Sequence, residues 1–151
     1  MIIFWLIVDL LYGLLTINAL ATADSVIIPV QTQYLPLKGM TQLIQTINRT
    51  KVQINPKLKI EGVLLTIADM KTNLTKATID KLKHDYSSRI KIFDTIIPQG
   101  VKLPESTVKG MSVYSYDKNS KPSRAYEEFT MEVLKNNEKN RFRINECRWI
   151  V

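Results

Sequence analysis

Four short apolar runs, separated by segments with helical spacing, set the pattern of this chain. They lie at residues 2–8, 26–30, 58–67 and 90–97, and they are rich in Val, Ile and Leu at successive positions. Successive apolar positions are typical of strands buried on both faces, as in a parallel sheet. We therefore expect an α/β fold in which one parallel sheet is flanked by helices. Pro29 suggests a strand end or an edge.

The segments between these runs carry the helices that we expect. They are residues 14–21, 37–50, 74–86 and 122–135. The first is apolar nearly all round, which predicts a well-buried helix. The connection from Pro98 to Lys121 contains glycines, prolines and hydroxyl residues, and we expect it to be irregular.

Two of these helices have a predicted buried face. In residues 37–50 the apolar positions recur at helical spacing, at Met40, Leu43, Ile44 and Ile47. In residues 74–86 we expect the sheet to be faced by Leu74, Ala77, Ile79 and Leu82. Thr72 or Asn73 can cap the start of that helix.

The apolar N-terminus allows a second interpretation, as a signal or membrane segment. Residues 1–23 are long and apolar and end in small residues. However, no positive charge precedes them, and Asp9 interrupts the run with a carboxylate that is costly at bilayer depth. Gly13 divides the run into two pieces, each too short to span a membrane. We therefore expect a buried strand and helix here, and no stable membrane span.

Composition places the chain among ordinary globular proteins with a basic surface. Of its 151 residues, 45% are apolar and 23% are charged, and the formal net charge is +7. A basic balance favours anionic partners, such as nucleic acid or nucleotide, but solvated surface lysines explain it equally well. The single cysteine, Cys147, excludes an internal disulfide and a cysteine-built zinc site, and it fits a reducing compartment.

The stretch from Gly13 to Leu43, GLLTINALATADSVIIPVQTQYLPLKGMTQL, closely resembles the ParA/Soj family of chromosome- and plasmid-partitioning ATPases. These are deviant Walker-type P-loop proteins related to MinD. The resemblance extends from about Ile2 to Leu134. It implies a P-loop NTPase-like fold, ATP and Mg²⁺ as cofactors, and ATP-dependent dimerisation. It also implies non-specific DNA as a ligand, a ParB-type partner protein, and a cytoplasmic, nucleoid-associated location.

Asp9 follows the first apolar run, where the family places a carboxylate that holds Mg²⁺ through water. The same position could also serve as a helix cap. The family continues from this Asp with two prolines, whereas this chain reads Asp9-Leu10-Leu11-Tyr12-Gly13 and is two residues shorter. In the family these prolines rigidify the loop beside the γ-phosphate, so the departure removes a feature on which nucleotide sensing depends.

The family's phosphate-binding loop, of the form Lys-Gly-Gly-Val-Gly-Lys-Thr, has no counterpart in this sequence. None of the five glycines is followed by Lys-Ser or Lys-Thr, and no two glycines lie close together. Such loops need glycines so that backbone N–H groups can cradle phosphate. The resemblance therefore covers the carboxyl-terminal half of a ParA-like domain, at residues 1–136, followed by a basic tail at 137–151. We expect no catalytic residue here and no ATP hydrolysis by the chain alone.

A second motif, Gly62-Val-Leu-Leu-Thr-Ile-Ala-Asp-Met-Lys-Thr-Asn-Leu74, resembles the family's GVLLTMYD-x-RTNL. In relatives the strand end at Thr66 approaches the adenine. The basic residue of the loop, here Lys71, belongs to a DNA-binding surface. Lys in place of Arg keeps the charge but loses the bidentate geometry. The alternative for Lys71 is a solvated loop lysine.

A third motif, Thr95-Ile-Ile-Pro-Gln-Gly-Val-Lys-Leu-Pro104, resembles the family's TVIPRNVRLSEAP. The resemblance implies that Pro98 and Gln99 help to form the adenine pocket and that Lys102 contributes to DNA binding. Gln99 and Gly100 stand where the family has Arg and Asn. A neutral Gln cannot replace an Arg contact to phosphate, so DNA binding should be weaker.

Two features carry no strong functional signal. The tail, RFRINECRWIV, could be an amphipathic membrane segment, but a poorly ordered or frame-altered end without a clear partner in the core explains it better. His84 is expected on the surface, because no Cys, Asp or Glu cluster accompanies it at metal-ligand spacing.

Two other interpretations of the whole chain stay open. One is a small basic protein, membrane-anchored or secreted, with no enzymatic activity, and the other is a decayed gene product that does not fold stably.

Overall fold

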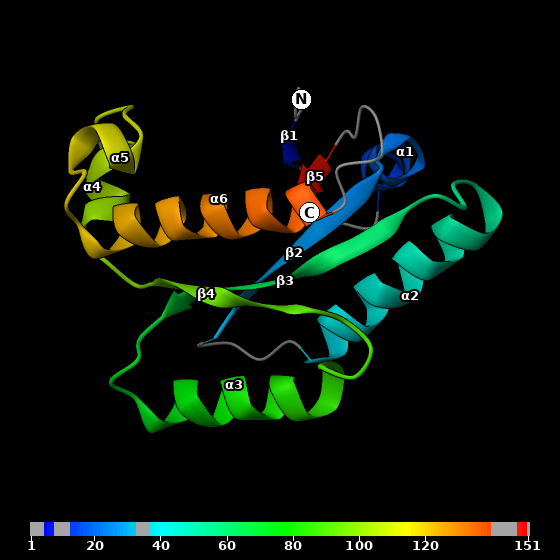
Figure 1. Ribbon diagram of the computed structural model, residues 1–151, viewed down its shortest axis with the longest axis horizontal. Coiled ribbons are helices and arrows are strands. Elements are labelled where there is room, and N and C mark those ends of the chain that lie inside the picture. Colours follow the sequence, from blue (N-terminus) through cyan, green and yellow to red (C-terminus); the bar gives the residue numbers. More distant parts are fainter. Residues whose placement is uncertain (1–4, 8–12, 33–36, 140–147, 151) are drawn as a thin grey trace.

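Strands and helices alternate along most of the computed structural model, which describes residues 5–7, 13–32, 37–139 and 148–150 (Figure 1). The strands are β1 (Trp5–Ile7), β2 (Ser25–Gln31), β3 (Lys59–Ala68), β4 (Ile92–Pro98) and β5 (Arg148–Ile150). The helices are α1 (Leu14–Thr22), α2 (Leu37–Gln53), α3 (Asn73–Tyr86), α4 (Lys102–Val108), α5 (Val113–Tyr116) and α6 (Lys121–Lys139). Strands β1 to β4 thus lie within or overlap the four apolar runs.

The strands form one parallel sheet in the order β1-β5-β2-β3-β4, which confirms the predicted fold class. The longest pairing joins β2 to β3, from Ser25 opposite Lys59 to Gln31 opposite Thr66. Pro29 lies inside β2 and not at a strand end. It is tolerated there because the described pairing of β2 with β5, at residues 25–27, does not reach it.

Strand β5 was not expected from the sequence. Its three residues pair in parallel with β1 on one side and with the start of β2 on the other. The expectation that the tail has no partner in the core is therefore wrong for residues 148–150. Residues 140–147 lie outside the described part of the chain.

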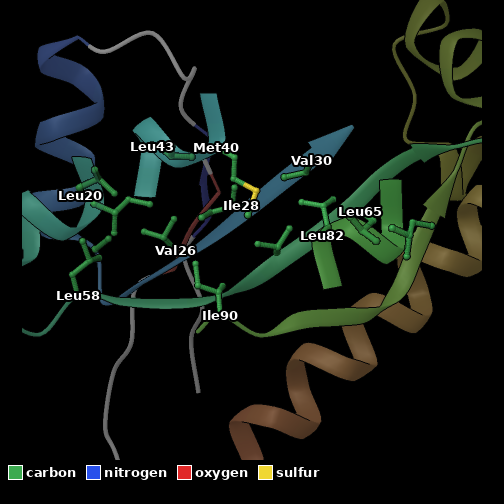
Figure 2. Close-up of a cluster of buried hydrophobic side chains, with 14 residues drawn as sticks. Leu20, Val26, Ile28, Val30, Met40, Leu43, Leu58, Leu65, Leu82 and Ile90 are labelled. Carbon is green, nitrogen blue, oxygen red and sulfur yellow. The ribbon is translucent and has the colours of Figure 1, made fainter. Parts of the chain in front are cut away.

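The main core lies between the sheet and helices α1, α2 and α3 (Figure 2). Alternate residues of β2 supply it, because successive side chains of a strand point to opposite faces. Val26, Ile28 and Val30 lie in this core, whereas Ile27 lies in the core on the other face. Helix α2 adds Met40, Leu43 and Ile47, as its spacing predicts. Each side chain of this size contributes about 1.5–3 kcal/mol when fully buried.

A smaller core packs α6 against the other face of the sheet. Phe93 of β4 and Phe129 of α6 meet edge to face, with ring centroids 5.0 Å apart. Gly62 of β3 makes room for this pair, since a Cβ on it would lie 2.8 Å from Cε2 of Phe93. The sheet is thus covered by helices on both faces, and the central strands β2 and β3 are buried over most of their length, as their continuous apolar runs predict. The prediction of a buried strand is wrong for the described end of β1, where Ile7 is 79% exposed.

Strand β4 is an edge strand and carries a bulge. Val63 pairs with Ile92 and Leu65 pairs with Ile96, so β4 uses more residues than β3 over the same length. Within the bulge, the backbone N–H groups of Asp94 and Thr95 both donate to the carboxylate of Glu132, at 3.1 Å. The hydroxyl of Thr95 donates to the same carboxylate at 2.8 Å. Helix α6 therefore satisfies the irregular part of the strand.

Two predicted helix faces need correction. In α1, Leu14 and Leu15 are 79% and 77% exposed, so the helix is not well buried. Its buried residues form a narrow stripe of Thr16, Ala19 and Leu20. In α3, Leu74 is exposed, and the buried residues are Thr75, Thr78, Ile79 and Leu82. The helical period is as predicted, but Thr75 and Thr78 are buried in place of Leu74 and Ala77.

The connection between β4 and α6 is also more regular than expected. It contains the short helices α4 and α5, which contact one another and lie beside the start of α6 (Figure 1). Ser112 caps α5 by accepting a hydrogen bond from the backbone N–H of Ser115 at 3.1 Å. The hydroxyl of the buried Ser123 lies within hydrogen-bonding distance of two backbone carbonyls, those of Val113 at 3.0 Å and Asp117 at 2.6 Å. These polar contacts, rather than an apolar pattern, order the connection.

Candidate functional site

A cleft opens at the carboxyl ends of β3 and β4, with a volume of about 780 Å³. One wall is formed by residues 67–71, which end β3 and begin the loop before α3. The other is formed by residues 98–101, 103 and 104, and Lys121 of α6 completes the lining. Ligands of parallel α/β sheets bind outside the carboxyl ends of the strands. The cleft therefore lies where this architecture places its sites.

Backbone hydrogen bonds hold the two walls together. The N–H of Gln99 donates to the carbonyl of Ala68 at 3.0 Å, which joins the end of β4 to the end of β3. Asp69 accepts from the N–H of Lys71 at 3.1 Å through its side chain, and its carbonyl accepts from the hydroxyl of Thr72 at 3.0 Å. Thr72 in turn caps α3, as predicted, by accepting from the N–H of Thr75. The loop is a closed turn that leaves the side chain of Lys71 exposed.

Ile67 lines the cleft in a strained backbone conformation. Its φ angle is 52°, and such a value is unusual for a β-branched residue. The residue is held by the buried Thr32, which follows β2. The N–H of Thr32 donates to the carbonyl of Thr66 at 3.2 Å, and its hydroxyl donates to the carbonyl of Ile67 at 3.4 Å. Backbone strain of this kind concentrates at functional sites, which supports a role for the cleft.

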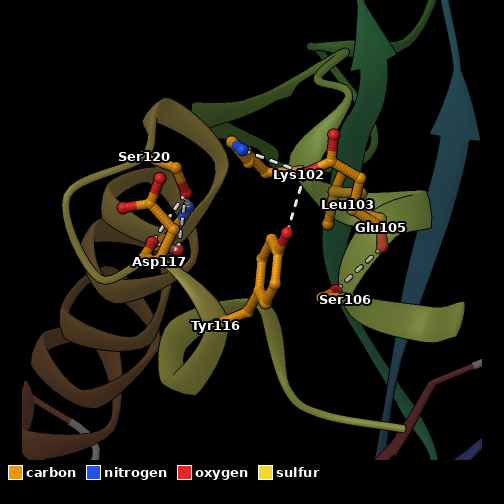
Figure 3. Close-up of polar contacts among 8 residues, drawn as sticks. Lys102, Leu103, Glu105, Ser106, Tyr116, Asp117 and Ser120 are labelled. Carbon is orange, nitrogen blue, oxygen red and sulfur yellow. Dashed lines mark hydrogen bonds and ion pairs between the residues drawn. The ribbon is translucent and has the colours of Figure 1, made fainter. Parts of the chain in front are cut away.

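Lys102 lies on α4 and contacts a carboxylate there (Figure 3). Its Nζ is 2.9 Å from Oε2 of Glu105, which also accepts a hydrogen bond from the hydroxyl of Tyr116 at 3.0 Å. The hydrogen bond with Glu105 raises the pKa of Lys102, and the hydrogen bond with Lys102 lowers the pKa of Glu105. The ammonium also lies 5.5 Å from the centroid of the Tyr116 ring. Lys102 is thus engaged within the protein.

The structure brings together three of the residues that the sequence predicts for the site. Lys71, Pro98 and Gln99 all line the cleft. Thr66 lies at the end of the β2–β3 pairing, one residue before Ile67, and does not line it. Lys102 is next to the lining residues in sequence but contacts Glu105. Asp9 lies outside the described residues.

Lys121 was missed as a lining residue, and a close backbone approach explains its position. A Cβ on Gly100 would lie 2.7 Å from Cγ of Pro122, so only glycine lets the start of α6 come this close. The sequence signal was the presence of Gly100 where the family has Asn, from which no approach of α6 could be predicted. The contact brings Lys121 to the rim of the cleft.

The cleft suits a partly apolar ligand that carries negative charge. Met70, Pro98 and Leu103 provide apolar surface, and Lys71 and Lys121 provide two positive charges against the single carboxylate of Asp69. In the described ranges no group of three His, Cys, Asp or Glu side chains is placed to hold a metal ion. His84 is exposed, as expected, and its Nδ1 lies 2.9 Å from Oδ1 of Asp85. Among the helices that the structure describes, none is both long and apolar enough to cross a membrane.

Comparisons with known proteins agree on one family. A family model described as an AAA domain matches residues 7–60. The sporulation initiation inhibitor protein Soj of Bacillus subtilis is 42% identical over 124 residues, which cover 82% of this chain and 48% of Soj. The chromosome partitioning protein ParA of Myxococcus xanthus is 39% identical over 123 residues, which cover 82% of this chain and 43% of ParA. The chain thus spans less than half the length of these relatives.

Solved structures show the same fold. Cobyrinic acid a,c-diamide synthase from Mycobacterium smegmatis, solved with bound ADP and magnesium, superposes with a TM-score of 0.68 at 26% identity. The match covers 87% of this chain and 45% of the synthase. The same synthase with an ATP analogue and magnesium gives the same values.

Proposed function

Because this chain belongs to the ParA/Soj family of partitioning ATPases, we propose that its β3–β4 cleft binds the base of an adenine nucleotide and that Lys71 contacts DNA. The observation that carries the proposal is the cleft itself. It unites the loop containing Lys71 with the loop containing Pro98 and Gln99, at the carboxyl edge of the sheet. A structural neighbour of the same fold has been solved with ADP and magnesium.

The residues present fit the base of the nucleotide. The ring of Pro98 and the side chain of Leu103 offer apolar surface for a planar ring, and a cleft of about 780 Å³ has the size of a small-molecule site. Lys71 and Lys121 at the rim favour a ligand with phosphates. Bound nucleotide would bring the negative charge, and these two lysines would orient it.

The described residues do not fit the phosphate and magnesium end of the site. The sequence has no glycine-rich loop followed by Lys-Ser or Lys-Thr, and the structure describes no carboxylate cluster for a hard cation. We therefore propose that this chain by itself binds nucleotide without hydrolysing it. In this proposal a complete ParA-like site is needed for three activities: ATP turnover, ATP-dependent dimerisation and stimulation by a ParB-type partner.

DNA binding rests more on Lys71 than on Lys102. Lys71 is exposed, and its ammonium makes no ion pair with any residue that the structure describes. Lys102 is already paired with Glu105, so it would have to exchange that contact for a phosphate. Non-specific DNA binding of this kind would place the protein on the nucleoid.

Titration with ADP tests the nucleotide site. Gln99→Trp places a large side chain at the cleft, and Gln53→Trp at the exposed end of α2 is the matched control. We expect the parent chain and Gln53→Trp to bind ADP saturably and with the same affinity. Gln99→Trp should bind ADP about tenfold more weakly. Equal affinity of both variants, or no binding by the parent, would contradict the proposal.

Fluorescence anisotropy with duplex DNA tests the second part. Lys71→Ala should weaken binding and reduce the slope of log K against log salt by about one phosphate contact, roughly 0.9. Lys76→Ala, an exposed lysine on α3, is the control. A salt-independent affinity, or an equal loss in the control, would overturn the role of Lys71.

A further inference from the structure

A second groove lies at the opposite edge of the sheet, at the amino ends of β3 and β4. It is open to solvent, with a volume of about 780 Å³. Its flanks are α2, from Thr41 to Lys51, and the last turn of α3 with the turn that follows. A hydrogen bond of 3.0 Å between the hydroxyls of Thr41 and Tyr86 joins these flanks. The groove shares no lining residue with the β3–β4 cleft.

The floor of the groove is apolar. Ile47, Leu58 and Ile90 are buried beneath it as part of the main core, and Leu58 and Ile90 are labelled in Figure 2. Ile44 and Ile60 pack on that core but remain partly exposed, so they offer their surface to a ligand. Apolar surface of this kind favours an occupant that can insert a hydrophobic side chain.

The rim of the groove is cationic. Lys51 of α2, Lys59 at the start of β3 and Arg89 before β4 all line it and are exposed. Their side chains form no ion pair or hydrogen bond with any part of the chain that the structure describes. Among the lining residues that the structure describes, the only carboxylate is that of Asp85, and its Oδ1 lies 2.9 Å from Nδ1 of His84. The rim therefore carries an excess of positive charge, three cations against one carboxylate.

We propose that this groove docks a short acidic segment of a partner protein, with at least one apolar side chain on the floor and carboxylates against the rim. The concave shape favours a peptide over DNA or an anionic membrane, because an extended surface cannot reach a recessed floor. The span of α2 from Thr41 to Lys51 is about 15 Å at 1.5 Å per residue, the length of a few extended residues. Gln45 and Asn48 on the same flank offer amide groups to a peptide backbone.

Selection from a displayed library of random short peptides tests this proposal on the full chain. The immobilised parent should enrich peptides that are net acidic and contain Leu, Ile, Phe or similar residues. A labelled synthetic copy of an enriched peptide then measures affinity. The double reversal Lys51→Glu with Arg89→Glu should weaken it by at least about 100-fold, because two attractions become repulsions. The reversal Lys76→Glu with Lys81→Glu, on exposed positions of α3, should leave it within about twofold.

A second variant separates the floor from the charges. Ile44→Trp fills the floor and keeps every cation, and it should weaken peptide binding by about tenfold. Far-UV circular dichroism and the unfolding midpoint must match the parent for each variant that is compared. No enrichment, enrichment of neutral or basic peptides, or equal loss in both charge reversals would overturn the proposal. Displacement of the bound peptide by duplex DNA or by vesicles of phosphatidylglycerol would overturn it as well, in favour of those ligands.

Discussion

Glu132 joins helix α6 to the bulge of the edge strand β4, and its replacement by Gln tests how that strand is held. The carboxylate accepts hydrogen bonds from the N–H groups of Asp94 and Thr95 and from the hydroxyl of Thr95. Lys91 Nζ lies 3.6 Å away. Gln keeps the shape of the side chain but loses its charge, and its NH₂ group cannot accept from an N–H.

The expected loss follows from these contacts. A hydrogen bond to a charged group contributes about 1.5–3 kcal/mol, and Gln retains one acceptor oxygen. The side chain of Glu132 is 17% exposed, so water can replace part of what is lost. We expect Glu132→Gln to lower the free energy of unfolding by about 1–2 kcal/mol, measured by urea denaturation. Glu128→Gln, on an exposed position one turn earlier in α6, should change it by less than about 0.5 kcal/mol.

The pH dependence gives a sharper test of the same residue. Burial alone would raise the pKa of Glu132, but the hydrogen bonds from Thr95 and Asp94 outweigh it and hold the pKa below its ordinary value of 4.5. A carboxyl whose pKa is lowered in the folded state stabilises the protein above its unfolded pKa, and the stabilisation is lost as pH falls through the folded pKa. The gap between parent and Glu132→Gln should therefore be full at neutral pH and shrink below about pH 4.5. A gap that does not narrow as the pH falls below about 4.5, or one no larger than the gap between the parent and Glu128→Gln, would refute the reasoning.

Two further substitutions test packing and capping, each by urea denaturation. Gly62→Ala should lower the free energy of unfolding by about 1–3 kcal/mol, because its Cβ would lie 2.8 Å from the Phe93 ring and 3.0 Å from the carbonyl of Lys91; a neutral result would show that the ring can move aside. Thr72→Ala should cost about 1 kcal/mol through loss of the α3 cap, and Thr72→Ser should restore most of it, whereas equal losses would contradict a capping role.

The strands could be predicted from sequence because burial on both faces leaves a strong signal. In β2, every residue from Ser25 to Ile28 is buried, and the unbroken apolar run reflects this directly. Helix α2 was equally clear, because Met40, Leu43 and Ile47 repeat at the spacing of one helix face. Both elements could be predicted without information about their contacts with the rest of the chain.

Other features depend on contacts that local pattern does not encode. The exposure of Leu14 and Leu15 depends on how α1 packs against the rest of the chain. The sequence of an apolar helix does not show which of its sides is buried. Burial of Thr75 and Thr78 in α3 was missed because threonine is usually counted as a polar residue. Its methyl group can nevertheless pack in a core as an apolar side chain does. Strand β5 is three residues long, too short to stand out in a basic tail.

The candidate site was predicted in part. The family resemblance pointed to Lys71, Pro98 and Gln99, and the structure places them around one cleft. It could not show that Lys102 is paired with Glu105, since that contact depends on the geometry of α4. It also could not show the approach of Pro122 to Gly100, which joins two distant parts of the chain.

Photolabelling with an 8-azidoadenine nucleotide tests the central claim most directly. After irradiation of the full chain and proteolysis, mass spectrometry locates the residues that carry the adduct. The account predicts adducts within residues 67–71 and 98–104, the two walls of the β3–β4 cleft, and their loss when excess ADP competes. Adducts that persist with ADP, or that lie elsewhere in the chain, would contradict it.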